Sequence, residues 1–189
     1  MVEFIIWFGG GALGYAAALT LVAIAAMQIF AGRILWRTLP LVFCAGAFVA
    51  LTQHPFPELG ALECPVASAA PLLRPLGFTE PIARLLEQDA SLSEWLGNRW
   101  FLATLVNYLV CCVIGLCWGL NGGGARAAIF FGFSLSLACE LTQLTGIWGI
   151  YPCAYRAFNV DDLLLNTLGC VTGAALFAWW RGRRLVSGA

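Results

Sequence analysis

Long runs of apolar residues, separated by shorter polar segments, recur through the whole chain. A transmembrane α-helix needs about 20 consecutive and mostly apolar residues, so such runs are the main signal for a membrane span. Candidates lie at about residues 11–31, 38–53, 100–120, 127–147 and 160–180, and the second is the shortest. The pattern predicts an all-α bundle of about five transmembrane helices, organised as a single membrane domain over residues 1–189.

The composition also indicates a lipid environment. Hydrophobic residues make up 61% of the chain and charged residues 11%, whereas soluble domains have about half and about a quarter. The basic residues are all arginines, scattered along the chain, and acidic residues balance them to a net charge of zero. A nucleic-acid binder gathers its basic residues on one face, so we expect no nucleic-acid partner.

The arginines in the connections between spans predict the orientation of the chain. One side would carry Arg33, Arg37, Arg126, Arg181, Arg183 and Arg184. The opposite side would carry Arg74, Arg84, Arg99 and Arg156 in longer segments. Short cytoplasmic loops are enriched in basic residues. We therefore expect the amino terminus outside the cell and the carboxyl terminus in the cytoplasm.

The segment at residues 54–99 would then form one long outer loop, rich in proline and acidic residues. Pro81 is suited to the start of a short helix, and Ser91 with Glu94 forms a capping-box pattern ahead of Trp95. We expect short interfacial helices there. The loop is either a solvated acidic connector or, as long ordered loops often are, a functional lid or partner platform.

Three polar residues share one depth on consecutive spans. Asn107, Glu140 and Asn166 each lie on the order of 10 Å below the outer edge, at a rise of about 1.5 Å per residue. Gln143 follows Glu140 by three residues and shares its face. A charged carboxylate within the bilayer costs at least about 2.5 kcal/mol, so Glu140 should face the bundle and either find a partner or be protonated.

The last span continues this polar set. Asp162 lies four residues before Asn166 and shares its face, whereas Asp161 points about 100° away. Gly169 and Gly173 extend the Asn166 stripe and would allow another helix to approach closely.

Arg156 is the nearest cation in sequence to these acids. A planar guanidinium can bind two carboxylates at once, so we expect Arg156 to bridge Glu140 and Asp162. Such a network could also do no more than hold the helices together.

The sequence of these residues resembles the VanZ-like family of bacterial membrane proteins, whose name comes from a teicoplanin-resistance protein. The resemblance rests on SLACELTQ (136–143) and RAFNVDDLLLNTLGCVTG (156–173), with Asn107 in the preceding span. It covers a core at about residues 100–180. Where the family usually has an aspartate, this chain has Asn159. The resemblance implies a multi-pass protein of the bacterial cell membrane, a role in the cell envelope and reduced susceptibility to teicoplanin-type lipoglycopeptides. It implies no established reaction.

The favoured function is binding of a lipid or amphiphile headgroup in an outward-facing polar pocket. The partner would be a membrane lipid, a lipid-linked envelope molecule or a lipoglycopeptide, and no cofactor is expected. A metal site is not expected either, because Arg156 lies beside the acids. The predicted ligand-binding residues are Asn107, Glu140, Gln143, Arg156, Asp161, Asp162 and Asn166.

Two other functions stay open. Glu140 and Asp162 could be the acid and base of an intramembrane enzyme that acts on a lipid-linked substrate. Alternatively, the protein could be a structural partner of envelope synthases, bound through residues 54–99. The oligomeric state does not follow from the sequence.

Two cysteines lie in outer segments, whereas the other six lie within spans and resemble small apolar residues. Cys64 and Cys153 would face an oxidising compartment. We expect a disulfide between them that holds the acidic loop over the polar residues.

Overall fold

The structure, a computed structural model, describes residues 2–187, with side chains from residue 10 to residue 183. The helices are α1 (Val2–Ala31), α2 (Leu39–Gln53), η1 (Ala67–Ala69), α3 (Thr79–Glu87), α4 (Leu92–Gly97), α5 (Arg99–Leu120), α6 (Ala125–Leu144), α7 (Gly146–Gly149) and α8 (Val160–Ser187). Within residues 2–187 no strand forms, and the only β-type pairing is an isolated bridge between Leu72 and Asn159. The all-α prediction is confirmed. The side chain of Arg184 lies outside the described part.

The number of full-length spans is lower than the sequence predicted. By length and apolar composition α1, α5, α6 and α8 can cross a membrane, which makes four helices in the described residues. The expected second span forms as α2, but its 15 residues extend only about 22 Å at 1.5 Å per residue. A bilayer core is about 30 Å thick. The prediction of five full spans is therefore corrected to four, with α2 as a shorter apolar helix.

The fourth span also ends earlier than expected. The predicted range ran to residue 147, but α6 ends at Leu144. Ile147 and Trp148 then adopt left-handed backbone angles, with φ of 55° and 56°. A right-handed α-helix needs a negative φ of about −63° at each residue, so α6 cannot continue through them.

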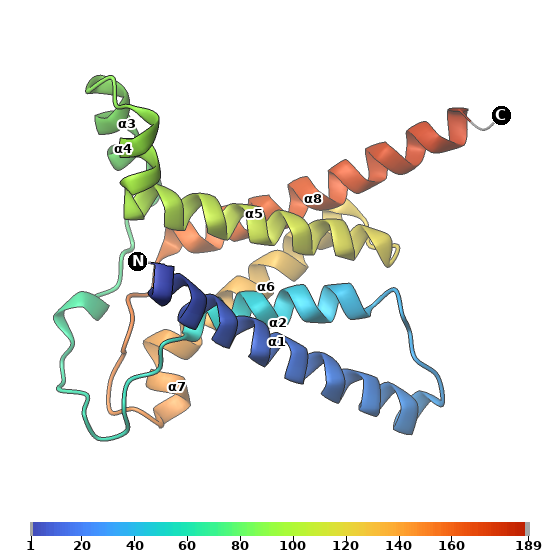
Figure 1. Cartoon of the computed structure of the whole chain (residues 1–189), viewed down its shortest axis with the longest axis horizontal. Coiled ribbons are helices and arrows are strands. Elements are labelled where there is room, and N and C mark those ends of the chain that lie inside the picture. Colours follow the sequence, from blue (N-terminus) through green and yellow to red (C-terminus); the bar gives the residue numbers. More distant parts are fainter. Residues whose placement is uncertain (1, 188–189) are drawn as a thin grey trace.

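The apolar helices run back and forth, so their connections gather at two ends of the molecule (Figure 1). We call residues 54–98 and 145–159 the loop end. The arginine end comprises residues 32–38, residues 121–124 and the last turns of α8. In the bundle, α8 packs against both α5 and α6, and α1 packs against α2. At the arginine end the side chain of Asn121 joins two connections, because its Nδ2 donates to the Arg37 carbonyl at 2.8 Å.

Glycines on α8 allow its close contact with α5. A Cβ atom placed on Gly169 would lie 2.5 Å from the Tyr108 carbonyl oxygen, and one on Gly173 would lie 1.9 Å from that of Cys112. Both distances are too short for any side chain. The close approach predicted at Gly169 and Gly173 is confirmed.

Short helices form within residues 54–98 as predicted. The Ser91–Glu94 capping box is present, with the Ser91 N–H donating to Glu94 at 2.7 Å. The Ser91 hydroxyl and N–H hold the pKa of Glu94 below its usual value. Helix α3 begins at Thr79, two residues before Pro81. The interfacial location of α3 and α4 stays a prediction.

Candidate polar site at the loop end

The start of α8 is held in place by polar contacts from two directions. The Asn159 side chain accepts a hydrogen bond from the Asp161 N–H at 3.1 Å, which makes Asn159 the N-cap of the helix. The Asn159 N–H donates to the Glu140 carboxyl group on α6 at 2.7 Å. Asparagine and aspartate are comparable N-caps. Asn159 can therefore cap the helix at the position where the resemblance implies an aspartate.

The polar residues of α5, α6 and α8 meet below this cap. Asn107 donates to the Asp162 carboxyl group at 3.4 Å, and the Glu140 and Asp162 carboxyl groups lie close enough to interact electrostatically. One turn deeper, Asn166 donates to the Ser136 hydroxyl at 2.9 Å. Sequence analysis placed Asn107, Glu140 and Asn166 at one depth, whereas the structure arranges these residues in two layers, with Asn166 one turn deeper beside Ser136.

Ser136 is a site residue that sequence analysis did not single out. It is 1% exposed, and its hydroxyl donates to the Asp162 carbonyl at 3.2 Å. Its position four residues before Glu140, on the same helix face, was a signal that could have identified it. The Oδ1 atom of Asn166, beside it, is buried without a hydrogen-bond partner.

Arg156 does not bridge Glu140 and Asp162, contrary to the prediction. Its guanidinium donates to the Thr52 carbonyl in the last turn of α2. Gln143 donates to the same oxygen at 2.7 Å. Carbonyls in the last turn of a helix lack a helical partner, and they attract cations through the helix dipole. The end of α2 therefore draws Arg156 away from the carboxylates.

Gln53 and Tyr155 form a second contact that sequence analysis missed. Gln53 is 5% exposed; its amide donates to the Cys139 carbonyl at 3.1 Å and accepts from the Tyr155 hydroxyl at 2.5 Å. Burial raises the pKa of Tyr155 to about 12. These contacts fix the end of α2 against α6 and the 150–159 segment.

Asp161 binds the outer loop rather than the polar residues below it. Its carboxylate accepts the Leu76 N–H at 2.6 Å and the Phe78 N–H at 3.0 Å. Leu76 has a positive φ of 62°, so this anchor stabilises a conformation that is unfavourable for leucine. The parallel bridge between Leu72 and Asn159 reinforces the attachment. Asp161 faces away from Asn166, as predicted.

The loop is attached at a further point. Cys64 and Cys153 are bonded through their sulfur atoms at 2.06 Å, and the Tyr151 hydroxyl donates to the Pro57 carbonyl at 2.7 Å. The pairing is the one the sequence led us to expect. That the two cysteines are oxidised in the native protein stays a prediction.

Some of the polar residues are buried, whereas others are partly exposed. Glu140, Gln143 and Asn166 are buried, with at most 5% exposure, whereas Asn107, Arg156 and Asp162 are half-buried. We call these residues, with Ser136, the polar cluster. The more open group supplies amide, guanidinium and carboxylate functions, which suit a polar or charged headgroup.

The apolar helices and the buried polar cluster define a multi-pass membrane protein. The family model described as VanZ/LLP1 matches residues 41–181. The chain belongs to the VanZ/LLP1 family. The match begins earlier than the core predicted at about residues 100–180, so α2 and the outer loop belong to the family region as well. Neither the curated proteins nor the solved structures contain a match.

Proposed function

We propose that the protein binds the anionic headgroup of a membrane lipid or a lipid-linked envelope molecule at the polar cluster. The proposal rests on how the charge of Arg156 is paired. Among the described residues the only ion pair joins Arg84 to Glu80. Arg156 is half-buried and lies near Glu140 without forming an ion pair with it.

Arg156 has N–H groups that make no hydrogen bond within the described residues. A guanidinium carries five N–H groups, and Arg156 has one hydrogen bond within the described residues, to the Thr52 carbonyl. A phosphate or carboxylate headgroup could use the remaining donors in a bidentate contact. Gln143 shares the Thr52 carbonyl with Arg156, so it would orient the guanidinium.

The family resemblance implies a phenotype to which this binding could contribute. It implies reduced susceptibility to teicoplanin-type lipoglycopeptides, which are amphiphiles. We propose that the protein acts in the outer leaflet of the bacterial cell membrane, on a lipid or lipoglycopeptide headgroup held beneath the loop.

The test compares two arginines of the loop end. Arg156→Ala should weaken binding of phosphatidylglycerol by about 10-fold or more, because a charged hydrogen bond contributes about 1.5–3 kcal/mol. Arg84→Ala should change it less than twofold, since Arg84 is exposed and paired with Glu80. Native mass spectrometry of the purified protein measures both affinities, in an Arg181→Gln background that removes a basic residue from the arginine end. Equal affinities of the two variants would refute the proposal.

A second candidate function is an intramembrane enzyme. The direct approach of the Glu140 and Asp162 carboxyl groups favours it, since paired acids can divide acid and base roles. Glu140→Gln distinguishes the two functions because the amide can still accept the Asn159 N–H. In an enzyme this variant retains binding and loses turnover of a lipid-linked substrate; in a binding protein it weakens binding itself.

A further inference from the structure

Two adjoining hollows lie on α8 toward the arginine end, away from the polar cluster. The first, of about 330 Å³, is lined by Gly119, Gly122, Gly123, Ala174, Phe177, Ala178, Arg181 and Gly182. The second, of about 400 Å³, is lined by Leu116, Leu176, Phe177, Trp179 and Trp180. Phe177 lines both, so they adjoin. The first contains a cation, whereas the second is lined by apolar and aromatic residues only.

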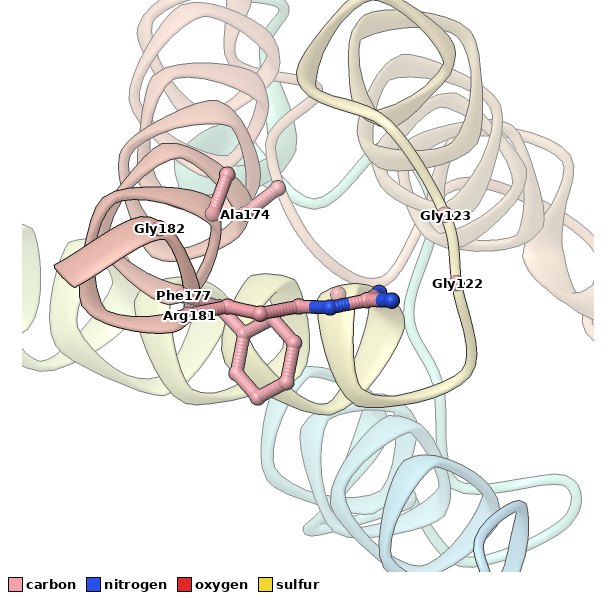
Figure 2. Close-up of a pocket in the computed structure, with 8 residues that line it drawn as sticks. Gly122, Gly123, Ala174, Phe177, Arg181 and Gly182 are labelled. Atoms are coloured by element: carbon pink, nitrogen blue, oxygen red, sulfur yellow. The ribbon is translucent and has the colours of Figure 1, made fainter. Parts of the chain in front are cut away.

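The first hollow is open toward the turn that joins α5 to α6. Figure 2 shows Arg181 extending from α8 toward the turn at Gly122 and Gly123, with Phe177 beside it. A Cβ atom on Gly119 would lie 2.8 Å from the Phe177 side chain. A larger residue at Gly119 would therefore displace Phe177, the residue that the two hollows share.

The position of the hollows is that of a membrane boundary. Helix α5 ends at Leu120, and Arg181 lies in the last turns of α8, which ends at Ser187. Trp179 and Trp180 are 57% and 45% exposed, and tryptophan is typical of the headgroup level. The cationic hollow thus lies at headgroup depth, and the apolar one adjoins it along α8.

The charges at this end favour an anion. The described residues of the arginine end include no acidic side chain, and none of its arginines forms an ion pair within those residues. Arg183 lies over the Trp179 ring at 4.1 Å and is absent from the lining of either hollow. The preference for basic residues in cytoplasmic loops explains why arginines gather here. It does not explain why Arg181, and not Arg183, lines one of these two hollows.

We infer that this face binds an anionic phospholipid of the adjacent leaflet. Its phosphate would bind Arg181 in the first hollow, and one acyl chain would lie in the second, against Phe177 and Trp180. This site is separate from the polar cluster and does not depend on the function proposed for it.

The experiment uses two arginines two residues apart on α8. Native mass spectrometry of the purified full chain measures binding of phosphatidylglycerol and phosphatidylcholine, in an Arg156→Ala background that weakens the proposed loop-end site. We expect phosphatidylglycerol to bind at least about fivefold more tightly, as one arginine near a charged surface allows. Arg181→Gln should abolish this preference. Arg183→Gln should retain it, because Arg183 stacks on Trp179.

Two further measurements distinguish a lipid-binding hollow from a general effect of charge. Ala178→Leu, at an exposed position that lines the first hollow, should weaken phosphatidylglycerol binding while retaining the charge. Inorganic phosphate at millimolar concentration should not displace the lipid. The inference would be overturned if Arg181→Gln and Arg183→Gln had equal effects, or if the parent bound both lipids equally well. It would also be overturned if Ala178→Leu had no effect on phosphatidylglycerol binding, or if inorganic phosphate displaced the lipid. A thermal unfolding midpoint unchanged in Arg181→Gln shows that the variant is folded.

Discussion

In the polar cluster, several side chains are buried and bound to other segments, whereas the arginines of the arginine end with described side chains are exposed. Glu140, Gln143 and Asn166 are at most 5% exposed and contact α2, α6 or the start of α8. Arg181 and Arg183 are exposed, and Arg183 lies over a tryptophan. The arginines of this end differ in the surface beside each of them, because Arg181 lines a hollow and Arg183 lies over a ring. In the polar cluster the geometry of single hydrogen bonds decides what the side chains can do.

The largest expected difference between the two ends is the side of the membrane on which each of them lies. A cysteine at exposed Gln88 should react with a membrane-impermeant thiol reagent in intact cells, and one at Gly124 should not, because basic loops stay in the cytoplasm. A Cβ atom at Gly124 would meet nothing within 4 Å, so the label is tolerated there. Reversed labelling would contradict the orientation.

Packing differs along α8 as well. Gly169→Leu should prevent accumulation of folded protein, since its Cβ atom would lie 2.5 Å from the Tyr108 carbonyl oxygen. Gly182→Leu, near the arginine end, should accumulate normally because a Cβ atom there meets nothing within 4 Å. Size-exclusion chromatography of fluorescent fusions measures both. Similar yields would show that α5 and α8 are not closely packed.

The disulfide between Cys64 and Cys153 should stabilise the folded protein against thermal unfolding. Its cysteines are 89 residues apart, and loss of a native disulfide typically costs about 2–5 kcal/mol. The Cys64→Ser/Cys153→Ser double variant should unfold several degrees below the parent. A reductant should lower the midpoint of the parent and leave the variant unchanged. Free thiols at both positions, in mass spectrometry of unreduced protein, would refute the disulfide.

Asp161 should affect the loop without affecting the helices. Asp161→Ala removes the acceptor of the Leu76 and Phe78 N–H groups. Their amide hydrogen exchange should accelerate about 10-fold or more, given about 1.5–3 kcal/mol for a charged hydrogen bond. Glu87→Ala, on an exposed position of α3, should leave this exchange unchanged. Unaltered exchange in Asp161→Ala would contradict the anchor.

The smallest effect concerns Tyr155. Burial raises its pKa to about 12, whereas the usual value is about 10. Between these pH values the folded state keeps a proton that the unfolded state releases, so stability falls as pH rises through that window and is unaffected below it. Absorbance titration at pH 11 should find one more protonated tyrosine in the parent than in Tyr155→Phe. An unchanged titration curve would exclude a buried Tyr155.

Parts of the site could be predicted because they depend on local patterns. The cost of a charge in lipid requires Glu140 to face the bundle, and helical spacing relates it to Gln143 and Ser136. Asn159 ahead of the acidic pair is a recognisable N-cap. Gly169 and Gly173 predicted the close contact of α8. In each case the signal itself lies within a few residues in sequence.

The partner of Arg156 could not be predicted in this way. Proximity in sequence and opposite charge favoured Glu140 and Asp162, but the guanidinium binds the Thr52 carbonyl, which lies 104 residues away in the chain. Backbone carbonyls occur at every residue, so nothing in the sequence marks this one. It is available because α2 ends there, and tertiary packing places that end beside residues 155 and 156.

The sequence by itself determined that the chain is helical, that several of its apolar helices are long enough to cross a membrane, and that polar residues gather near one end. These properties follow from apolar length and helical period, which are local. Only the tertiary structure decided that Asp161 binds the Leu76 and Phe78 N–H groups, that Gln53 accepts from Tyr155, and that Arg156 binds α2. Each of these contacts joins segments far apart in the chain, so it depends on how the helices pack and not on their individual sequences.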